Sequence, residues 1–177
     1  MRRSAFKWEL IGIVIISILG AVLHFLFELS GQLAPVGVIA AVNESVWEHF
    51  KIGFWPALLY AAVEYPFLRK YTANFLVAKA ACVYVIPVTI AIVFYSYTSV
   101  FGQEILLVDI LIFVFAIALG QLTSYKILTS SQLPRWLDLV GLSLIILLAV
   151  AFGAFTFYPP HIPLFQDSTS GGYGIIN

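Results

Sequence analysis

The sequence predicts an all-α, polytopic integral membrane protein that folds as one domain over residues 1–177. Hydrophobic residues make up 62% of the chain and charged residues only 10%, whereas a soluble domain carries about a quarter charged residues. Several apolar runs reach the ~20 residues that a helix needs to cross a bilayer. Because these runs are continuous and do not alternate with a period of two, they exclude a transmembrane β-barrel.

The charge balance and the cysteine content narrow the class further. The formal net charge is zero, so we expect no nucleic-acid partner. Cys82 is the single cysteine and lies within an apolar run, which excludes a disulfide framework within the chain and favours a small buried residue. The first apolar run follows a basic stretch but is long enough to span, so we expect a retained helix and no cleaved signal peptide.

The apolar runs define five expected transmembrane helices, at about residues 8–29, 45–67, 73–100, 104–125 and 136–158. Segment 31–43 is apolar but too short to cross and is broken by glycine and proline, so it should lie at the interface or re-enter the membrane. Ser45-Val46-Trp47-Glu48 has the pattern of a capping box at the start of the second helix. The tail, residues 159–177, is too short and too polar to span again.

Basic residues predict the orientation of these helices. They gather before the first run, after the second and after the fourth, at Arg2, Arg3, Lys7, Arg69, Lys70, Lys126 and Arg135. With five crossings, all three groups fall on one side of the bilayer, which the positive-inside bias makes cytoplasmic. The chain should therefore be a multi-pass protein of the cell membrane, with its N-terminus inside and segment 31–43 and the tail outside.

The polar side chains gather on the expected outer side. Residues 43–51, Asn-Glu-Ser-Val-Trp-Glu-His-Phe-Lys, bring two carboxylates, an imidazole, a hydroxyl and an ammonium into nine positions, and all three histidines fall on this side. Ionisable groups in membrane segments usually face the bundle interior and pair with one another. Imidazoles and carboxylates are ligands of zinc. The expected metal ligands are His24, Glu28, His49 and His161.

Four further residues are candidates for catalysis beside such a metal. Glu48 or Glu44 would act as general base on a metal-bound water, and Ser45 or Asp167 would orient the water or the substrate. Simpler roles stand beside these. Glu48 has the place of the third residue in a capping box, Glu44 suits the positive end of the helix dipole, and Lys51 would extend its ammonium to the interface or pair with an acidic side chain.

Two resemblances rest on these residues. The stretch 43–51 and the tail segments Pro163-Leu164-Phe165-Gln166-Asp167 and Gly172-Tyr173-Gly174-Ile175 resemble a family of small prokaryotic multi-pass membrane proteins of unknown function. Ser45-Val46-Trp47-Glu48-His49 is similar to the Ser-x-x-x-His motif of the alkaline ceramidase and adiponectin-receptor-like membrane zinc hydrolases. That group has seven spans and a later His-x-x-x-His pair, which this chain lacks.

Three functions follow from these observations. The first is a zinc-dependent membrane hydrolase or lipid-active enzyme, with a lipid or small-molecule ligand at the outer face. The second is a transporter or binding protein for a small cation or amine. The third is a structural or assembly subunit, in which the polar groups only hold the helices together.

Overall fold

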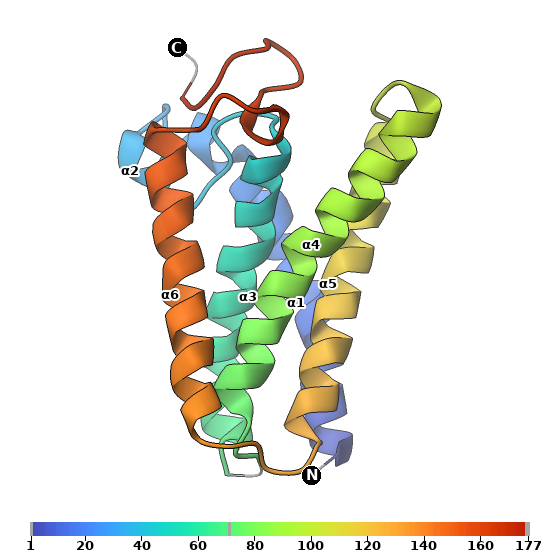
Figure 1. Ribbon diagram of the computed structural model, residues 1–177, viewed down its shortest axis with the longest axis vertical. Coiled ribbons are helices and arrows are strands. Elements are labelled where there is room, and N and C mark those ends of the chain that lie inside the picture. The colour runs from blue at the N-terminus through green and yellow to red at the C-terminus, as the bar shows by residue number, and fades with distance from the viewer. Residues whose placement is uncertain (1, 71, 176–177) are drawn as a thin grey trace.

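The computed structural model describes residues 2–70 and 72–175 and is built of helices (Figure 1). Five long helices run along one axis, with a short helix and a 3₁₀ turn at one end. Their bounds are α1 Arg2–Leu29, α2 Ala34–Gly37, α3 Val46–Leu68, α4 Phe75–Phe101, α5 Leu106–Leu128, α6 Trp136–Phe157 and η1 Pro163–Phe165. The described residues contain no β-strand, only an isolated bridge between Gln166 and Tyr173. The predicted all-α fold is confirmed.

The helices differ from the expected runs mainly at their ends. The first begins at Arg2, because the polar residues before the apolar run continue the same helix. Segment 31–43 contains the single turn of α2, whose second residue is Pro35, and Gly31 and Gln32 before it have positive φ angles of 73° and 60°. Left-handed backbone at these two residues ends α1. The connection that leads from α1 to α3 is therefore irregular.

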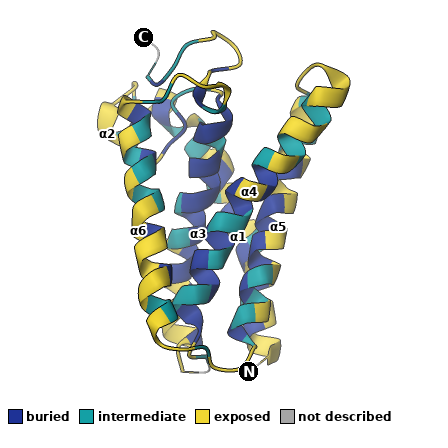
Figure 2. Ribbon diagram, in the orientation of Figure 1, coloured by how far each residue is buried: buried dark blue, intermediate teal, exposed yellow. Residues whose placement is uncertain are grey.

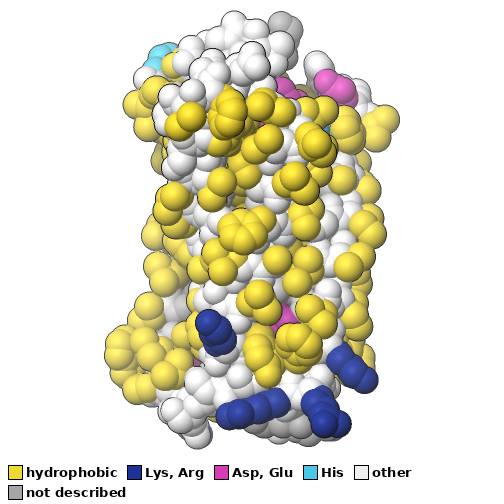
Figure 3. Space-filling model, turned by 90° about the vertical axis from the view of Figure 1, so that its right-hand side faces the viewer, with side chains coloured by type: hydrophobic (Ala, Val, Ile, Leu, Met, Phe, Trp, Pro, Cys, Tyr) yellow, Lys and Arg dark blue, Asp and Glu magenta, His cyan; other side chains and the backbone are white. Residues whose placement is uncertain are grey.

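The exterior of the bundle is the surface of a membrane protein. Four helices, α1, α4, α5 and α6, are long and apolar enough to cross a bilayer. Large side chains such as Ile18 on α1 and Leu147 on α6 are about 60% exposed. On the face drawn in Figure 3, hydrophobic side chains cover the middle, and Lys and Arg gather at one end. We call this end the basic end and the opposite one, which carries α2 and the tail, the tail end.

Helix α3 is not among the helices that are both long and apolar enough to cross a bilayer. It carries Glu48, Lys51 and Glu64 within its length, and all three are buried inside the bundle. Figure 2 shows that α3 is mostly buried, whereas α6 presents one side to the exterior. Because its neighbours cover it, α3 can hold charges that a lipid-facing helix would exclude.

One apolar core runs through all five long helices. Ile16, Phe54, Ile86, Ile117 and Phe152 are each fully buried and belong to the same cluster. Glycines let α1 approach its neighbours, as small residues do between membrane helices. A Cβ atom on Gly20 would come within 2.8 Å of the Ile52 carbonyl oxygen, and one on Gly12 would collide with Gln121. Cys82 is buried and free, as expected.

Lys51 ties the tail end of the bundle together. Its side chain is fully buried, and Nζ lies 2.5 Å from Glu48 Oε2. The same ammonium donates hydrogen bonds to the Gly37 carbonyl at 2.6 Å and to Thr156 Oγ1 at 2.8 Å. Lys51 thus connects α3 with α2 and α6. It does not reach the interface, because three acceptors inside the bundle satisfy its three N–H groups.

Candidate functional site

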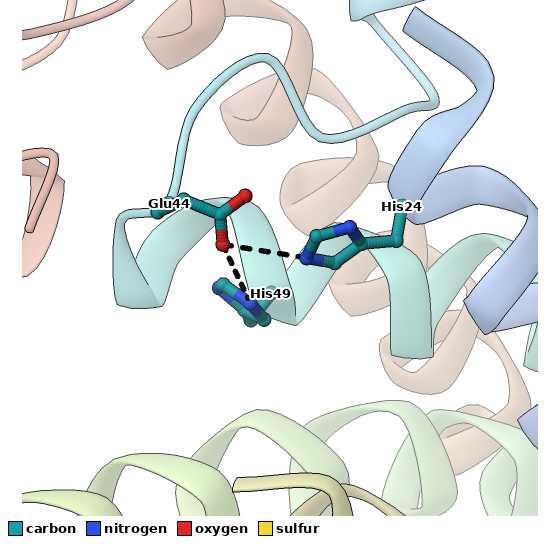
Figure 4. Close-up of side chains that lie close together, drawn as sticks. All are labelled: His24, Glu44 and His49. Carbon is teal, nitrogen blue, oxygen red and sulfur yellow. Dashed lines mark ion pairs between the residues drawn. The ribbon is translucent and has the colours of Figure 1, made fainter. Parts of the chain in front are cut away.

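Two histidines and one glutamate converge at the tail end of the bundle. Nε2 of His24 lies 3.4 Å from Glu44 Oε2, and Nε2 of His49 lies 3.6 Å from the same oxygen. The two imidazole rings are 5.3 Å apart between centroids. Figure 4 shows both rings turned toward the carboxylate, from α1 on one side and α3 on the other. The three ligand atoms all lie within 4.8 Å of one another.

Local structure at the start of α3 sets two of these side chains. Ser45 has extended backbone and caps α3, and its hydroxyl accepts a hydrogen bond from the Glu48 N–H. His49 stands one turn later, and its Nδ1 lies 2.8 Å from the Ser45 carbonyl oxygen. Since a carbonyl can only accept, Nδ1 donates to it, and Nε2 is the ring nitrogen that faces Glu44. Ser45 therefore fixes the tautomer of His49.

Glu44 is held at both its backbone and its carboxylate. Its N–H donates to Asp167 Oδ1 at 2.7 Å, which anchors it to the tail. The hydrogen bond with His24 holds the pKa of Glu44 below its usual value, although partial burial works in the opposite direction. Glu44 is thus an anion beside two imidazoles. His24 Nδ1 is buried and finds no partner among the described residues, so its polar contact is through Nε2.

The two distances from the Glu44 carboxylate can be compared with those in a tetrahedral zinc site. Zinc binds imidazole nitrogen and carboxylate oxygen at about 2.1 Å, which puts neighbouring tetrahedral ligands roughly 3.4 Å apart. The separations of 3.4 Å and 3.6 Å from Glu44 to the two histidines lie close to this value. Two histidines and a carboxylate also form one of the common ligand sets of catalytic zinc, which leaves a fourth position open.

The structure places the other two expected ligands away from this group. His161 is exposed on the tail and stacks on Tyr173, with 4.5 Å between ring centroids. Glu28 is exposed one turn beyond His24 and lines a neighbouring cavity together with His24, Glu44 and Asp167. Neither belongs to the set of ligand atoms that lie within 4.8 Å of one another.

Glu48 faces the bundle interior and does not line the cleft that His24, Glu44 and His49 share. Its carboxylate pairs with Lys51 and accepts a hydrogen bond from the Val42 N–H at 2.9 Å. The Ser45 hydroxyl is likewise used by the helix cap. Only one of the two hydrogen bonds of the expected capping box therefore forms. The Ser45 side chain caps α3, whereas the Glu48 carboxylate accepts from the Val42 N–H and not from the Ser45 N–H.

Asp167 organises the tail over the site. Its Oδ1 accepts from the Glu44 N–H, and its Oδ2 accepts from both the N–H and the hydroxyl of Ser170 at 2.6 Å. Burial alone would raise the pKa of Asp167, but these hydrogen bonds hold it below its usual value. Nearby, the Asn43 amide donates to the Gly174 carbonyl at 2.8 Å. The tail is thus fastened to the connection before α3.

We expect Asp167→Ala to release the tail. Removing a charged acceptor leaves three donors unpaired and costs about 1.5–3 kcal/mol, which makes the undocked tail roughly 10- to 100-fold more populated. Limited proteolysis with mass spectrometry should then cut within residues 159–175 correspondingly faster. Ser168→Ala is the control, because its exposed hydroxyl makes only a 3.4 Å contact with the Glu44 carbonyl. Digestion of Asp167→Ala at the wild-type rate would contradict this role.

The three side chains face a cleft of about 540 Å³. Its walls are mostly apolar, with Phe25, Ile90, Phe94, Ile112 and Phe113 among the lining residues. In Figure 1, α4 and α5 lean away from α3 and α6 toward the tail end, where this cleft lies. A volume of this size is typical of sites for small molecules or a lipid chain.

Glu104 and Asp109 line the same cleft and were not among the expected site residues. Glu104 precedes α5, and Asp109 lies in its first turn. Tyr97 on α4 donates its hydroxyl to Asp109 Oδ1 at 2.5 Å and accepts from the Ile105 N–H. Their place among the carboxylates of one bundle end was visible in the sequence, but the helix packing that turns them to the cleft was not.

A family model covers nearly the whole chain. The model of a family of unknown function (DUF6512) matches residues 1–175. No curated protein and no solved structure matches the chain. The family match gives no activity. The similarity of residues 45–49 to a motif of membrane zinc hydrolases stays a prediction.

Proposed function

We propose that this chain, which belongs to the DUF6512 family of unknown function, is a zinc-dependent membrane hydrolase. Its site at the tail end would act on a lipid-like substrate. The observation that carries this proposal is the convergence of His24, Glu44 and His49, with the carboxylate 3.4 Å and 3.6 Å from the two imidazoles, close to the separation of ligands in tetrahedral zinc sites. The cleft beside them is mostly apolar and large enough for part of an acyl chain. A ligand set of this kind beside an apolar cleft favours chemistry on an amphiphile.

In this proposal five helices cross the bilayer. Helix α3 has 23 residues, enough to span, and runs beside α1 and α4 (Figure 1). We count it as the fifth span, whose charged side chains lie inside the bundle. The basic end is then cytoplasmic by the positive-inside bias. The cleft, α2 and the tail lie at the outer leaflet of the cell membrane.

Each wall of the cleft has its own part in the reaction. His24, Glu44 and His49 hold the metal, with His49 kept in its binding tautomer by the Ser45 carbonyl. A zinc ion held there would lower the pKa of a bound water molecule. Glu104 or Asp109, from the other wall, would accept a proton from this water. Phe94 and Phe113 contact the hydrocarbon part of the substrate.

Metal analysis and a lipid assay test this proposal together. Protein reconstituted with Zn²⁺ in lipid vesicles should retain about one ion per chain, as a single tetrahedral site holds. Mass spectrometry should detect hydrolysis of ester-linked or amide-linked lipids, which a chelator stops and added Zn²⁺ restores. Failure to retain any transition metal would refute the metal site, and bound zinc without hydrolysis of either lipid class would refute the hydrolase.

A further inference from the structure

A second cluster of ionisable side chains lies at the opposite end of the bundle. It consists of Glu9 on α1, Glu64 on α3 and Lys79 on α4, whose exposed fractions are 1%, 0% and 3%. The three residues come from three helices and have no part in the tail-end site. Charged residues buried at this depth are rare and usually mark a functional group of the protein.

Lys79 stands between the two carboxylates. Its Nζ donates to Glu9 Oε1 at 2.7 Å and also pairs with the Glu64 carboxylate. The Ser124 hydroxyl on α5 donates to Glu9 Oε1 at 2.8 Å. The second oxygen of each carboxylate is buried and has no hydrogen-bond partner among the described residues. Two carboxylates therefore share one cation and still have acceptors unfilled.

The other polar groups around the cluster are already engaged. The Tyr60 hydroxyl donates to the Trp8 carbonyl at 2.6 Å. The Cys82 thiol donates to Gln121 Oε1 at 3.3 Å, and the Gln121 amide donates to the Glu9 carbonyl at 3.4 Å. None of these side chains brings a positive charge. With both carboxylates ionised, the cluster would keep one net negative charge in the interior of the bundle.

We propose that Glu9 and Glu64 form a proton-binding site that holds one shared proton at neutral pH. Burying an uncompensated charge costs several kcal/mol, and one proton removes that charge. A neutral carboxylic acid also costs far less to bury without a hydrogen-bond partner than an ionised carboxylate does, and the second oxygen of each carboxylate has no partner among the described residues. A proton needs no cavity, unlike a metal ion with its coordination shell. The two carboxyl groups titrate as a pair, with the proton belonging to both.

Infrared spectroscopy of the protein in a detergent without ester, amide or carboxyl groups tests this site. At pH 7 the wild type should show the carbonyl band of a protonated carboxylic acid, and this band should shift in D₂O. Glu9→Gln and Glu64→Gln should each abolish it, because one carboxylate then remains opposite one ammonium. Lys79→Met keeps both carboxylates without the cation, so it should retain the band. Glu104→Gln, at the other end of the bundle, is the control and should leave it unchanged.

The outcomes separate cleanly. Absence of the band in the wild type would overturn the proposal without any variant being needed. A band that survives Glu9→Gln or Glu64→Gln would come from another carboxyl group and would also overturn it, as would its loss in Lys79→Met. These measurements use no metal and no lipid substrate, so their result is independent of the proposed hydrolase.

Discussion

Lys51→Met should destabilise the folded protein by about 3–5 kcal/mol, the usual cost of removing one partner from a buried ion pair. The variant keeps the aliphatic volume of the side chain but removes the ammonium. Glu48 is then left as an unpaired charge that is only 2% exposed, and the Gly37 carbonyl and Thr156 lose their donor. Thermal unfolding in detergent, followed by circular dichroism, should show a markedly lower midpoint than that of the wild type.

Two further variants show whether the pairing itself is responsible. Lys126→Met removes an ammonium near the basic end and should leave the midpoint unchanged. The double variant Lys51→Met/Glu48→Gln replaces the unpaired Glu48 carboxylate with a neutral amide and should recover part of the lost stability. An unfolding midpoint of Lys51→Met equal to that of the wild type would mean that this pair does not hold α2 and α6 to α3.

The combined substitution His24→Ala/His49→Ala should weaken zinc binding by at least about 100-fold. Loss of a group that only orients a ligand already weakens metal binding 10- to 100-fold, and here two ligands are removed outright. Zinc affinity can be measured by competition with a chelating dye. Lipid hydrolysis should fall in parallel, because the proposed reaction would depend on the zinc ion that these residues would hold.

His161→Ala is the matched control for this pair. It also removes an imidazole at the tail end, but His161 stacks on Tyr173 outside the ligand group. Zinc affinity should be unchanged in this variant. A different result would contradict the metal site: no detectable zinc binding in the wild type, together with a lower unfolding temperature in His24→Ala/His49→Ala. The three side chains would then only stabilise the packing of α1 against the start of α3.

Much of the fold could be predicted from the continuity of the apolar runs. The expected helices agree with α1, α3, α4, α5 and α6 within a few residues, except that α1 begins six residues earlier. Hydropathy describes α3 poorly, because this helix is covered by its neighbours and carries Glu48, Lys51 and Glu64 inward. High hydropathy marks helices that face lipid, and α3 is largely covered by its neighbours.

The candidate site could be predicted only in part. The sequence predicts His24 and His49 as metal ligands and Glu44 as a general base at the same end of the bundle, and in the structure these three side chains lie together. The pairing of Glu48 with Lys51 has a sequence signal, since residues at i and i+3 share a helix face. Glu9, Glu64 and Lys79 have no such signal, because they come from three helices and meet only through tertiary packing.

Zinc-edge X-ray absorption of the reconstituted protein is a direct test of the proposed metal site. We expect a bound zinc ion with two imidazole nitrogens and a carboxylate oxygen among its ligands, and an unchanged spectrum in His161→Ala. A zinc spectrum without imidazole ligands would contradict it, and so would one that is identical in the wild type and in His24→Ala/His49→Ala.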